Sequence, residues 1–279
     1  MPLQRPAVTA VPQVEVLQLP SLAAVDWLLH GFSTRAGGQS TAYSGSASAG
    51  ELNLGFTASD DRANVIANRE RFVEAVTGNP QFPVVTLAQV HSAIVQRVDE
   101  PRTASDSGFA KADGMITDHP RILLAIQTAD CISVLVADRK RRAVAGFHAG
   151  WRGTVKRIVE HGVAQMRLEF GSDPGDLLAA IGPGIGQCCY EVGQEVRDEF
   201  ESQFAYAAGL FRDGATAPKK LHLDLVEANR RQLLDAGVKA DTISLAQECT
   251  SCQTDRYFSY RAEGGFTGRM FSAIGIRPE

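Results

Sequence analysis

The chain has 279 residues, of which 44% are hydrophobic and 22% charged, and its formal net charge at pH 7 is −4. These values are typical of a globular protein, and they exclude disordered, collagen-like and small disulfide-rich chains. Because affinity for nucleic acid depends on clustered cations, the excess of 32 Asp and Glu over 28 Lys and Arg predicts no nucleic-acid partner.

One helix among several strands is predicted for the first half of the chain. Residues 1–12 contain three prolines and no periodicity, so we interpret them as a loose tail before a single domain at 13–279. Asp60 and Asp61 can cap a helix that runs to about Val76. The Gly-, Ser- and Ala-rich segment 35–55 is expected to be a long loop. Apolar runs predict strands at 14–19, 27–34, 84–90, 94–98, 122–126, 132–136 and 143–147.

Helices and strands alternate irregularly in the second half. Apolar periodicity predicts helices at 153–169, 193–208 and 221–236. Strands are expected at 177–181, 242–245, 257–261 and 270–276. Several predicted strands are apolar on both faces, which indicates sheets that are covered on both sides. The irregular order favours a single α/β domain with mixed sheets over a doubly wound parallel sheet.

Neither a membrane span nor a disulfide framework is expected. The most apolar stretch, 122–137, is interrupted by Gln127, Thr128 and Asp130, and the first residues contain no apolar region of signal-peptide length. No membrane partner is therefore predicted. The five cysteines are an odd number in a chain of this size, which favours free thiols in a reducing cytoplasm.

Two histidines and one cysteine stand out by their place beside apolar strands. His91 and His148 each follow such a strand, and Cys131 lies between two of them. Polar residues at strand ends converge in α/β folds, so these three could meet. Three interpretations stay open: a catalytic zinc site with an open fourth position, a Cys131 nucleophile with His148 as its base, and a buried thiol beside two core histidines. Copper-cluster chemistry is not expected, because no two of the six histidines form a His-x-His pair.

The segments around these residues resemble the signature of a bacterial protein family. They read QVHS from Gln89, TADC from Thr128 and FHAGWRG from Phe147. Further matching segments are STRAGG from Ser33, NLG from Asn53, ADG from Ala112, IGPGI from Ile181, YFSYR from Tyr257 and TGR from Thr267. On these motifs the chain resembles the bacterial laccase-domain family, also called the polyphenol oxidase or multicopper oxidase family.

The resemblance implies a fold, a metal and a chemistry. In the family the three motifs hold one zinc ion per chain, which implies zinc ligands at His91, Cys131 and His148. The implied fold is similar to the catalytic domain of cytotoxic necrotizing factor. The implied activity is phosphorolysis of adenosine, inosine, guanosine and methylthioadenosine, with inorganic phosphate as co-substrate, together with adenosine deamination. Zinc suits deamination because it lowers the pKa of its water to about 7. The alternative is a cysteine-type amidase that edits peptidoglycan precursors, with Cys131 as its nucleophile.

Arg35, Asn53 and Arg69 are the candidate substrate-binding residues. Arg69 lies on the apolar face of its predicted helix, where a buried guanidinium needs partners such as an anionic ligand. The alternative for Arg69 is a packed stem with its charged head in water. Arg35 follows a predicted strand, and Asn53 can donate a hydrogen bond to a phosphate or a hydroxyl. Arginines suit phosphorolysis because the guanidinium binds phosphate through two parallel hydrogen bonds.

The remaining cysteines are Cys188, Cys189, Cys249 and Cys252. The last two form a CxxC pair, and all four together could hold a second, structural zinc ion. However, the side chains of adjacent residues diverge in a strand, and the usual site of this kind combines two CxxC pairs. The sequence therefore favours four thiols that pack as small, buried apolar side chains.

Overall fold

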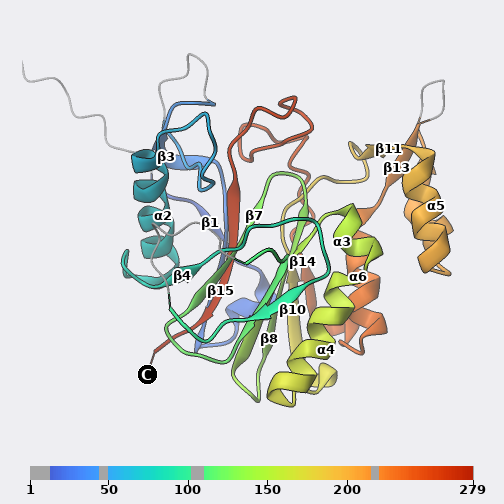
Figure 1. The fold of residues 1–279 in the computed structure, drawn as a ribbon, viewed down its shortest axis with the longest axis horizontal. Coiled ribbons are helices and arrows are strands. Elements are labelled where there is room, and N and C mark those ends of the chain that lie inside the picture. The colour runs from blue at the N-terminus through green and yellow to red at the C-terminus, as the bar shows by residue number, and fades with distance from the viewer. Residues whose placement is uncertain (1–12, 44–49, 102–109, 215–219, 279) are drawn as a thin grey trace, which may run out of the picture.

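Two mixed β-sheets packed face to face form the centre of the fold (Figure 1). The computed structural model describes residues 13–43, 50–101, 110–214 and 220–278. Helices cover the outer face of each sheet, so the layers follow the order helix, sheet, sheet, helices. This arrangement confirms the predicted mixed α/β fold. The predicted tail at 1–12 lies outside the described residues.

The first sheet has five strands, and a strand from the end of the chain lies at its centre. In spatial order the strands are β1 (Val16–Leu17), β2 (Leu28–Ser33), β15 (Met270–Ile276), β7 (Leu123–Thr128) and β4 (Val84–Val85). β15 is antiparallel to both neighbours, with Ser272 opposite Phe32 on one side and Ile126 on the other. β4 runs parallel to β7, which makes the sheet mixed.

The second sheet has six strands and is also mixed. Its order is β14 (Ile243–Leu245), β10 (Leu177–Ile181), β8 (Ile132–Asp138), β9 (Ala143–Ala149), β6 (Gly114–Thr117) and β5 (Val95–Arg97). β8 and β9 are antiparallel, whereas β10–β14 and β5–β6 are parallel pairs. Its outer face is covered by α3 (Trp151–Val155), α4 (Ile158–Phe170) and α6 (Leu225–Asp235).

Burial on both faces explains why the central strands are continuously apolar. Between the sheets, Ile126 and Ile274 of the first sheet join one cluster with Leu135 and Val144 of the second. All four are fully buried, and a side chain of this size contributes about 1.5–3 kcal/mol when it is removed from water. The two-sided burial that the sequence indicates is therefore confirmed.

α2 (Arg62–Thr77) covers the outer face of the first sheet, and it has the ends that the sequence predicts. The side chain of Asp61 accepts a hydrogen bond from the N–H of Ala63 and so caps the first turn. Gly78 ends the helix with a left-handed φ of 78°, which glycine adopts without strain. Phe72 and Val73 are fully buried against the sheet.

A third, small sheet lies next to α5 (Gln194–Gln203), beyond the helical layer (Figure 1). Its strands are β11 (Glu191–Val192), β13 (Leu221–Leu223) and β12 (Phe211–Asp213). Outside these layers lie α1 (Pro20–Ala23), β3 (Ala36–Ser40) and the 3-10 turns Pro174–Asp176, Ala207–Leu210 and Ala240–Thr242. Within the described ranges, no helix is long and apolar enough to cross a bilayer.

Two predicted helices differ from the structure: one is divided in two, and the other begins later than expected. The predicted helix at 153–169 is two helices, because Arg157 adopts a left-handed φ of 62° that separates α3 from α4. The predicted helix at 221–236 begins only at Leu225, because 221–223 pair as β13 and Asp224 caps the helix.

Two further predictions on strands and loops are wrong. The predicted loop at 35–55 contains β3, whose ends bridge to Glu51. The predicted strand at 257–261 is a loop, because its backbone bonds to side chains instead of a neighbouring strand. The N–H of Ser259 donates to Glu263, and the N–H of Arg261 donates to Asp130.

Candidate metal centre and substrate cavity

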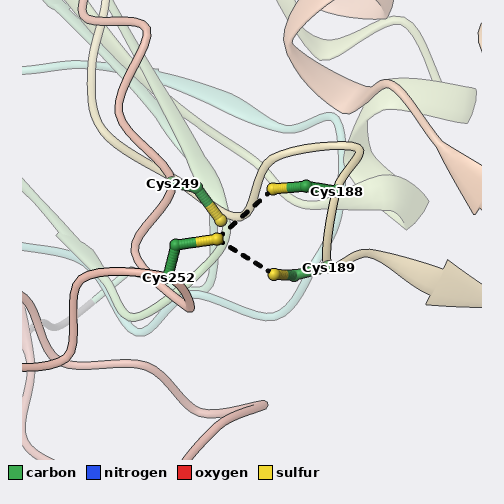
Figure 2. A group of neighbouring side chains, drawn as sticks. All are labelled: Cys188, Cys189, Cys249 and Cys252. Atoms are coloured by element: carbon green, nitrogen blue, oxygen red, sulfur yellow. Dashed lines mark hydrogen bonds between the residues drawn. The ribbon is translucent and has the colours of Figure 1, made fainter.

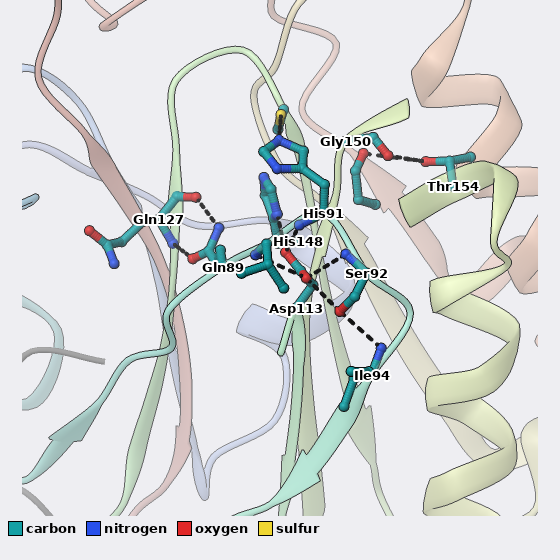
Figure 3. A network of polar contacts seen from close by, with 12 residues as sticks. Gln89, His91, Ser92, Ile94, Asp113, Gln127, His148, Gly150 and Thr154 are labelled. Atoms are coloured by element: carbon teal, nitrogen blue, oxygen red, sulfur yellow. Dashed lines mark hydrogen bonds and ion pairs between the residues drawn. The ribbon is translucent and has the colours of Figure 1, made fainter. Parts of the chain in front are cut away.

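Connections that cross from one sheet to the other bring the predicted site residues to one edge of the sandwich. β7 of the first sheet leads through 129–131 into β8 of the second, and Cys131 ends this crossing. β4 leads through the loop 86–94 into β5, and His91 lies in that loop (Figure 3). His148 lies near the end of β9, opposite Ser133 of β8. Strand pairing therefore places His148 beside Cys131.

The side chains of His91, Cys131 and His148 offer three metal-ligating atoms within 4.8 Å of one another. His91 Nε2 and Cys131 Sγ are 3.9 Å apart, and the two imidazole rings meet edge to face with their centroids 4.9 Å apart. A Cβ added to Gly150 would lie 2.9 Å from Cys131 Sγ and 3.0 Å from His91 Cδ2. Glycine at this position therefore lets the side chains of Cys131 and His91 lie directly against the backbone.

Asp113, a fully buried residue just before β6, holds the centre together (Figure 3). Its Oδ1 accepts hydrogen bonds from the His148 ring at Nδ1 (2.8 Å) and from the N–H of His91 (3.0 Å). Its Oδ2 accepts from the N–H (2.6 Å) and the hydroxyl (2.7 Å) of Ser92 and from the N–H of Val90 (3.2 Å). One carboxylate therefore fixes both the backbone around His91 and the ring of His148.

The hydrogen bond from His148 to Asp113 sets the tautomer of the imidazole. Burial alone would raise the pKa of Asp113, but the hydrogen bonds from His148 and Ser92 hold it well below its usual range. Asp113 is therefore a carboxylate, which only accepts hydrogen bonds, and the proton of His148 lies on Nδ1. Nε2 is therefore the nitrogen of His148 that faces Cys131 and His91 as a possible metal ligand.

Gln89 anchors the His91 loop to the first sheet. Its side-chain amide donates to the carbonyl of Gln127 and accepts from the N–H of the same residue, both at 2.8 Å (Figure 3). This pair imitates the hydrogen bonding of a neighbouring strand at the edge of β7. His91 itself has a left-handed φ of 57°, which is uncommon for a residue other than glycine. The hydrogen bonds of Gln89 before it and of its own N–H and Ser92 after it hold this conformation.

Cys131 and His148 form a thiolate–imidazolium pair when no metal is bound. Burial alone would raise the pKa of Cys131, but the charge and hydrogen bond of His148, with a further contribution from His91, lower it to about 6. Burial alone would lower the pKa of His148, but the Cys131 thiolate and Asp113 raise it to about 9. The site therefore stabilises a negative sulfur at neutral pH.

The donor set fits a catalytic zinc ion. One thiolate and two imidazoles leave a fourth coordination position for water or substrate. A histidine ligand whose other nitrogen bonds to a carboxylate is the usual outer arrangement of such sites, and Asp113 supplies this carboxylate.

A cavity of about 610 Å³ opens beside the three ligands. Its volume is within the range of about 300–1,000 Å³ that is usual for small-molecule sites. Three aromatic residues and three arginines from four separate segments contribute to its wall: Trp151, Tyr190, Tyr260, Arg152, Arg261 and Arg269. The cavity therefore combines flat apolar surface with positive charge next to the ligand set.

The three arginines of the cavity differ in how they are held. Arg152 is exposed and stacks on the ring of Trp151, with 4.3 Å between the guanidinium carbon and the ring centroid. Arg269 donates from Nη1 to the carbonyls of Thr267 and Gly268. Arg261 donates from both terminal nitrogens to the carbonyl of Glu191. Arg152 is thus the one that the described structure restrains least.

The three candidate substrate-binding residues lie behind the cavity wall instead of in it. Asn53 is fully buried, and its Oδ1 accepts a hydrogen bond from the N–H of Arg269 at 2.8 Å. Arg35 pairs with Glu51 at 2.6 Å and with Glu263 at 3.1 Å. Asn53 and Arg35 therefore contact the segment 259–269 that carries Tyr260, Arg261 and Arg269 to the cavity.

Arg69 is buried, as the helical pattern predicts, but among groups of the protein itself. It is 1% exposed, and its Nε donates to the carbonyl of Leu54 at 2.8 Å. Its guanidinium carbon lies 4.0 Å from the ring centroid of Phe56 and 5.0 Å from that of Phe271. Burial, together with the positive charge of Arg62, lowers the pKa of Arg69. The structure thus gives Arg69 structural partners.

Sequence reasoning does not identify Asp113 or the arginines of the cavity as functional. Asp113 lies in the ADG motif, and Arg261 and Arg269 end the YFSYR and TGR motifs, so the signal was present in the family resemblance. Their roles depend on contacts between segments far apart in the chain, which spacing does not indicate.

Comparison with known proteins gives close relatives over nearly the whole chain. The purine nucleoside phosphorylase YlmD of Geobacillus stearothermophilus is 39% identical over 262 residues, which cover 89% of this chain and 90% of that protein. The crystal structure of YlmD superposes with a TM-score of 0.84, at 35% identity, and covers 96% of this chain and 99% of its own. A purine nucleoside phosphorylase of Deinococcus radiodurans is 39% identical over 267 residues, 95% of this chain and 94% of that protein.

A further relative carries another activity in its name. An adenosine deaminase from an unknown prokaryotic organism is 38% identical over 192 residues, which cover 67% of this chain and 72% of that protein. The sequence profile of one family matches residues 29–277, which include every residue of the centre and the cavity. The chain belongs to this family, whose description is multi-copper polyphenol oxidoreductase laccase.

Proposed function

We propose that the chain is a purine nucleoside phosphorylase that also deaminates adenosine, with one zinc ion held by His91, Cys131 and His148. The observation that supports this most is the cavity of about 610 Å³, in which a three-ligand donor set lies next to three arginines. Relatives named purine nucleoside phosphorylase and adenosine deaminase share 38–39% identity with the chain. One nucleoside site serves both reactions, because adenosine is a substrate of each.

For deamination, the protein prepares its ligands so that a metal ion has to displace only the Nε2 proton of His148. A bound zinc ion supplies Lewis-acid chemistry, which lets water act as a nucleophile near neutral pH. Asp113 holds the Nδ1 proton of His148, so that loss of the Nε2 proton on metal binding would leave Nε2 to coordinate. Cys131 is already a thiolate at neutral pH, because its pKa is lowered to about 6. The reaction consumes adenosine and water and releases inosine and ammonia.

For phosphorolysis, the cavity supplies positive charge for inorganic phosphate. Phosphate replaces the base at the anomeric carbon, and the products are the free base and ribose 1-phosphate. Arg152 and Arg269 are the cavity arginines that we assign to phosphate, since both guanidinium groups lie at the wall and bind oxyanions through paired hydrogen bonds. Arg261 is held by the carbonyl of Glu191 and contributes charge from the side.

Aromatic side chains provide the surface for the purine. Trp151, Tyr190 and Tyr260 line the cavity, and a flat aromatic ring can stack on a purine base. Burial raises the pKa of Tyr190 above its usual range, so its hydroxyl keeps its proton at neutral pH and can donate a hydrogen bond. We assign Asn53 and Arg35 to a supporting role, because they hold the segment that carries Tyr260 and Arg269.

The test is product analysis with and without phosphate. Purified protein is given adenosine, and the products are separated by chromatography. We expect inosine and ammonia without phosphate, and adenine with ribose 1-phosphate when phosphate is added. His91→Gln should lose both activities and the bound zinc. His161→Gln is the matched control, since His161 is exposed on α4 and should keep both activities.

The amidase alternative gives the opposite pattern. A Cys131 nucleophile with His148 as base needs no metal, so chelation would leave turnover of a peptidoglycan precursor intact. Absence of nucleoside turnover in a zinc-loaded sample would contradict the proposed function. Turnover of adenosine in a demonstrably zinc-free sample would contradict its metal dependence.

A further inference from the structure

Four cysteines from two loops meet in a second cluster, which is separate from the first ligand set (Figure 2). Cys188 and Cys189 lie in the loop that follows β10, and Cys249 and Cys252 lie in the loop that follows β14. The Sγ atoms of all four are within 4.8 Å of one another. Cys252 Sγ is 3.5 Å from Cys188 Sγ and 3.3 Å from Cys189 Sγ, and all four thiols are free.

The exposure of these side chains does not fit the role of buried apolar thiols that the sequence favours. Cys188 and Cys252 are exposed, and the other two are half-buried. Free cysteines that serve only packing are among the most buried residues in proteins. The prediction of four buried apolar thiols is therefore wrong. Cys252 has two near neighbours at similar distances, so the thiols converge on one point instead of forming pairs.

A tight turn explains why two adjacent cysteines point the same way. The N–H groups of Cys189 and Tyr190 both donate to the carbonyl of Gly186 at 3.0 Å, which curls the chain over 186–190. In a turn, unlike a strand, consecutive side chains need not diverge, and Figure 2 shows both thiols directed at Cys249 and Cys252. A Cβ on Gly186 would lie 3.2 Å from Cys188 Sγ and from Cys249 Cβ, so the glycine keeps the cluster closed.

We propose that the four thiolates of Cys188, Cys189, Cys249 and Cys252 bind a structural zinc ion, in addition to the ion of the catalytic centre. Thiolates about 2.3 Å from a tetrahedral zinc ion lie about 3.8 Å from one another. The sulfur of Cys252 is 3.5 and 3.3 Å from those of Cys188 and Cys189, and all four sulfurs lie within 4.8 Å of one another. The N–H of Gly186 also donates to Cys249 Sγ at 3.2 Å, which stabilises a negative sulfur. Four sulfur ligands leave no open position, so this site is structural.

This second ion would join the two loops that form one wall of the cavity. Tyr190 follows Cys189 directly, and the segment after Cys252 leads to Tyr260 and Arg261. Between the two cysteines of the CxxC pair, Thr250 donates from its hydroxyl to Asp130 Oδ1 at 2.6 Å. Asp130 precedes Cys131 in the chain, so the cysteine cluster and the catalytic centre are connected through one hydrogen bond.

The experiment is metal analysis of the wild type and three variants, prepared under reducing conditions with zinc supplied. We expect two zinc ions per chain in the wild type, one in Cys252→Ser, one in Cys131→Ser and none in the double variant. Cys252 is exposed, so its replacement by serine removes little packing. If the cysteine cluster binds zinc but the centre at His91, Cys131 and His148 does not, Cys252→Ser will lower the zinc count and Cys131→Ser will leave it unchanged. Failure of the proposed function can therefore be told apart from failure of this proposal.

A measurement on the unmutated chain covers the case in which the variants do not fold. In the zinc-loaded wild type we expect Cys188 and Cys252 to resist a thiol reagent despite their exposure. A strong chelator, which removes both zinc ions, should then make the four thiols of the cluster reactive. Immediate reaction of both cysteines in zinc-loaded protein would overturn the proposal. A wild-type count of one zinc ion that Cys252→Ser leaves unchanged, a disulfide within the cluster, or iron in place of the second zinc would also overturn it.

Discussion

Replacing Asp113 by asparagine tests whether one buried carboxylate organises the catalytic centre. The two side chains have the same shape, but asparagine puts an NH2 group where a carboxylate oxygen accepts hydrogen bonds. At the Oδ1 position this group would face the His91 N–H and the ring of His148. At the Oδ2 position it would face the N–H groups of Val90 and Ser92. Either orientation leaves two buried or partly buried donors without an acceptor.

The size of the effect follows from these contacts. Each buried donor left unsatisfied costs about 1–3 kcal/mol, so two of them would cost about 2–6 kcal/mol. Because the hydrogen bonds to the backbone N–H groups are only partly buried, we expect the free energy of unfolding to fall by about 2–4 kcal/mol, the lower part of that range. In the first orientation His148 can relieve the conflict by moving its proton to Nε2, which removes that nitrogen as a metal ligand. Loss of such an outer contact weakens metal binding about 10–100-fold. That factor corresponds to about 1.4–2.7 kcal/mol.

The assay is zinc affinity by competition with a chromophoric chelator, together with urea unfolding of the metal-free protein. Asp138→Asn is the matched control, because Asp138 is equally buried and lies in the same sheet. Its Oδ1 accepts from the N–H groups of Lys140 and Arg141, whereas its Oδ2 has no hydrogen-bond partner among the described residues. The amide nitrogen can take that place with little loss. Wild-type zinc affinity in Asp113→Asn would refute the reasoning.

Four further predictions concern the core, the cavity and the metal centre. Burial lowers the pKa of His30 to about 4 from 6.5, so the unfolded chain binds a proton at a higher pH than the folded chain does. The free energy of unfolding should therefore fall by about 2 kcal/mol from pH 7 to pH 5. Urea titrations should show this pH dependence in the wild type and not in His30→Gln. Arg69→Met should lower the free energy of unfolding by about 2–4 kcal/mol and reduce both activities in parallel. Arg269→Gln should reduce the initial rate of phosphorolysis more than that of deamination. A larger loss of deamination in Arg269→Gln would contradict our assignment of Arg269 to phosphate. Gly150→Ala places a methyl group 2.9 Å from Cys131 Sγ, so we expect normal circular dichroism with at least a tenfold loss of zinc affinity, and full zinc affinity would argue against a metal at this point.

The fold could be predicted where one segment carries its own signals. α2 has a capping aspartate and a terminal glycine, and β10 and β15 are short apolar runs between turns, so their bounds follow from local sequence. The break between α3 and α4 has no such signal, because the residue with the left-handed backbone is an arginine, Arg157, and not a glycine. The aromatic run from Tyr257 to Arg261 has the composition of a strand, yet three of its N–H groups do not pair with a neighbouring strand: Tyr257 donates to the carbonyl of Gln253, Ser259 to the side chain of Glu263 and Arg261 to that of Asp130.

The candidate site shows the same limit. Proximity of Cys131 and His148 follows from their places at the ends of the neighbouring strands β8 and β9, whereas His91 reaches them from the loop 86–94. Helical spacing correctly predicts that Arg69 is buried, but it carries no information about what surrounds a buried residue. Asp113 and the thiol cluster depend on loops that meet only in the folded chain. Composition and spacing predict burial well and partners poorly.

The position of β15 has a consequence for how the protein folds. β15 follows every other described strand in the chain, yet it lies between β2 and β7 and pairs with both. During synthesis the facing edges of β2 and β7 therefore stay unpaired until Met270–Ile276 is available, and exposed apolar edges of this kind favour aggregation. A chain cut before Met270 would separate the first sheet into two ribbons and detach β7, whose end leads into Cys131. Completion of the candidate metal centre thus waits for the last strand.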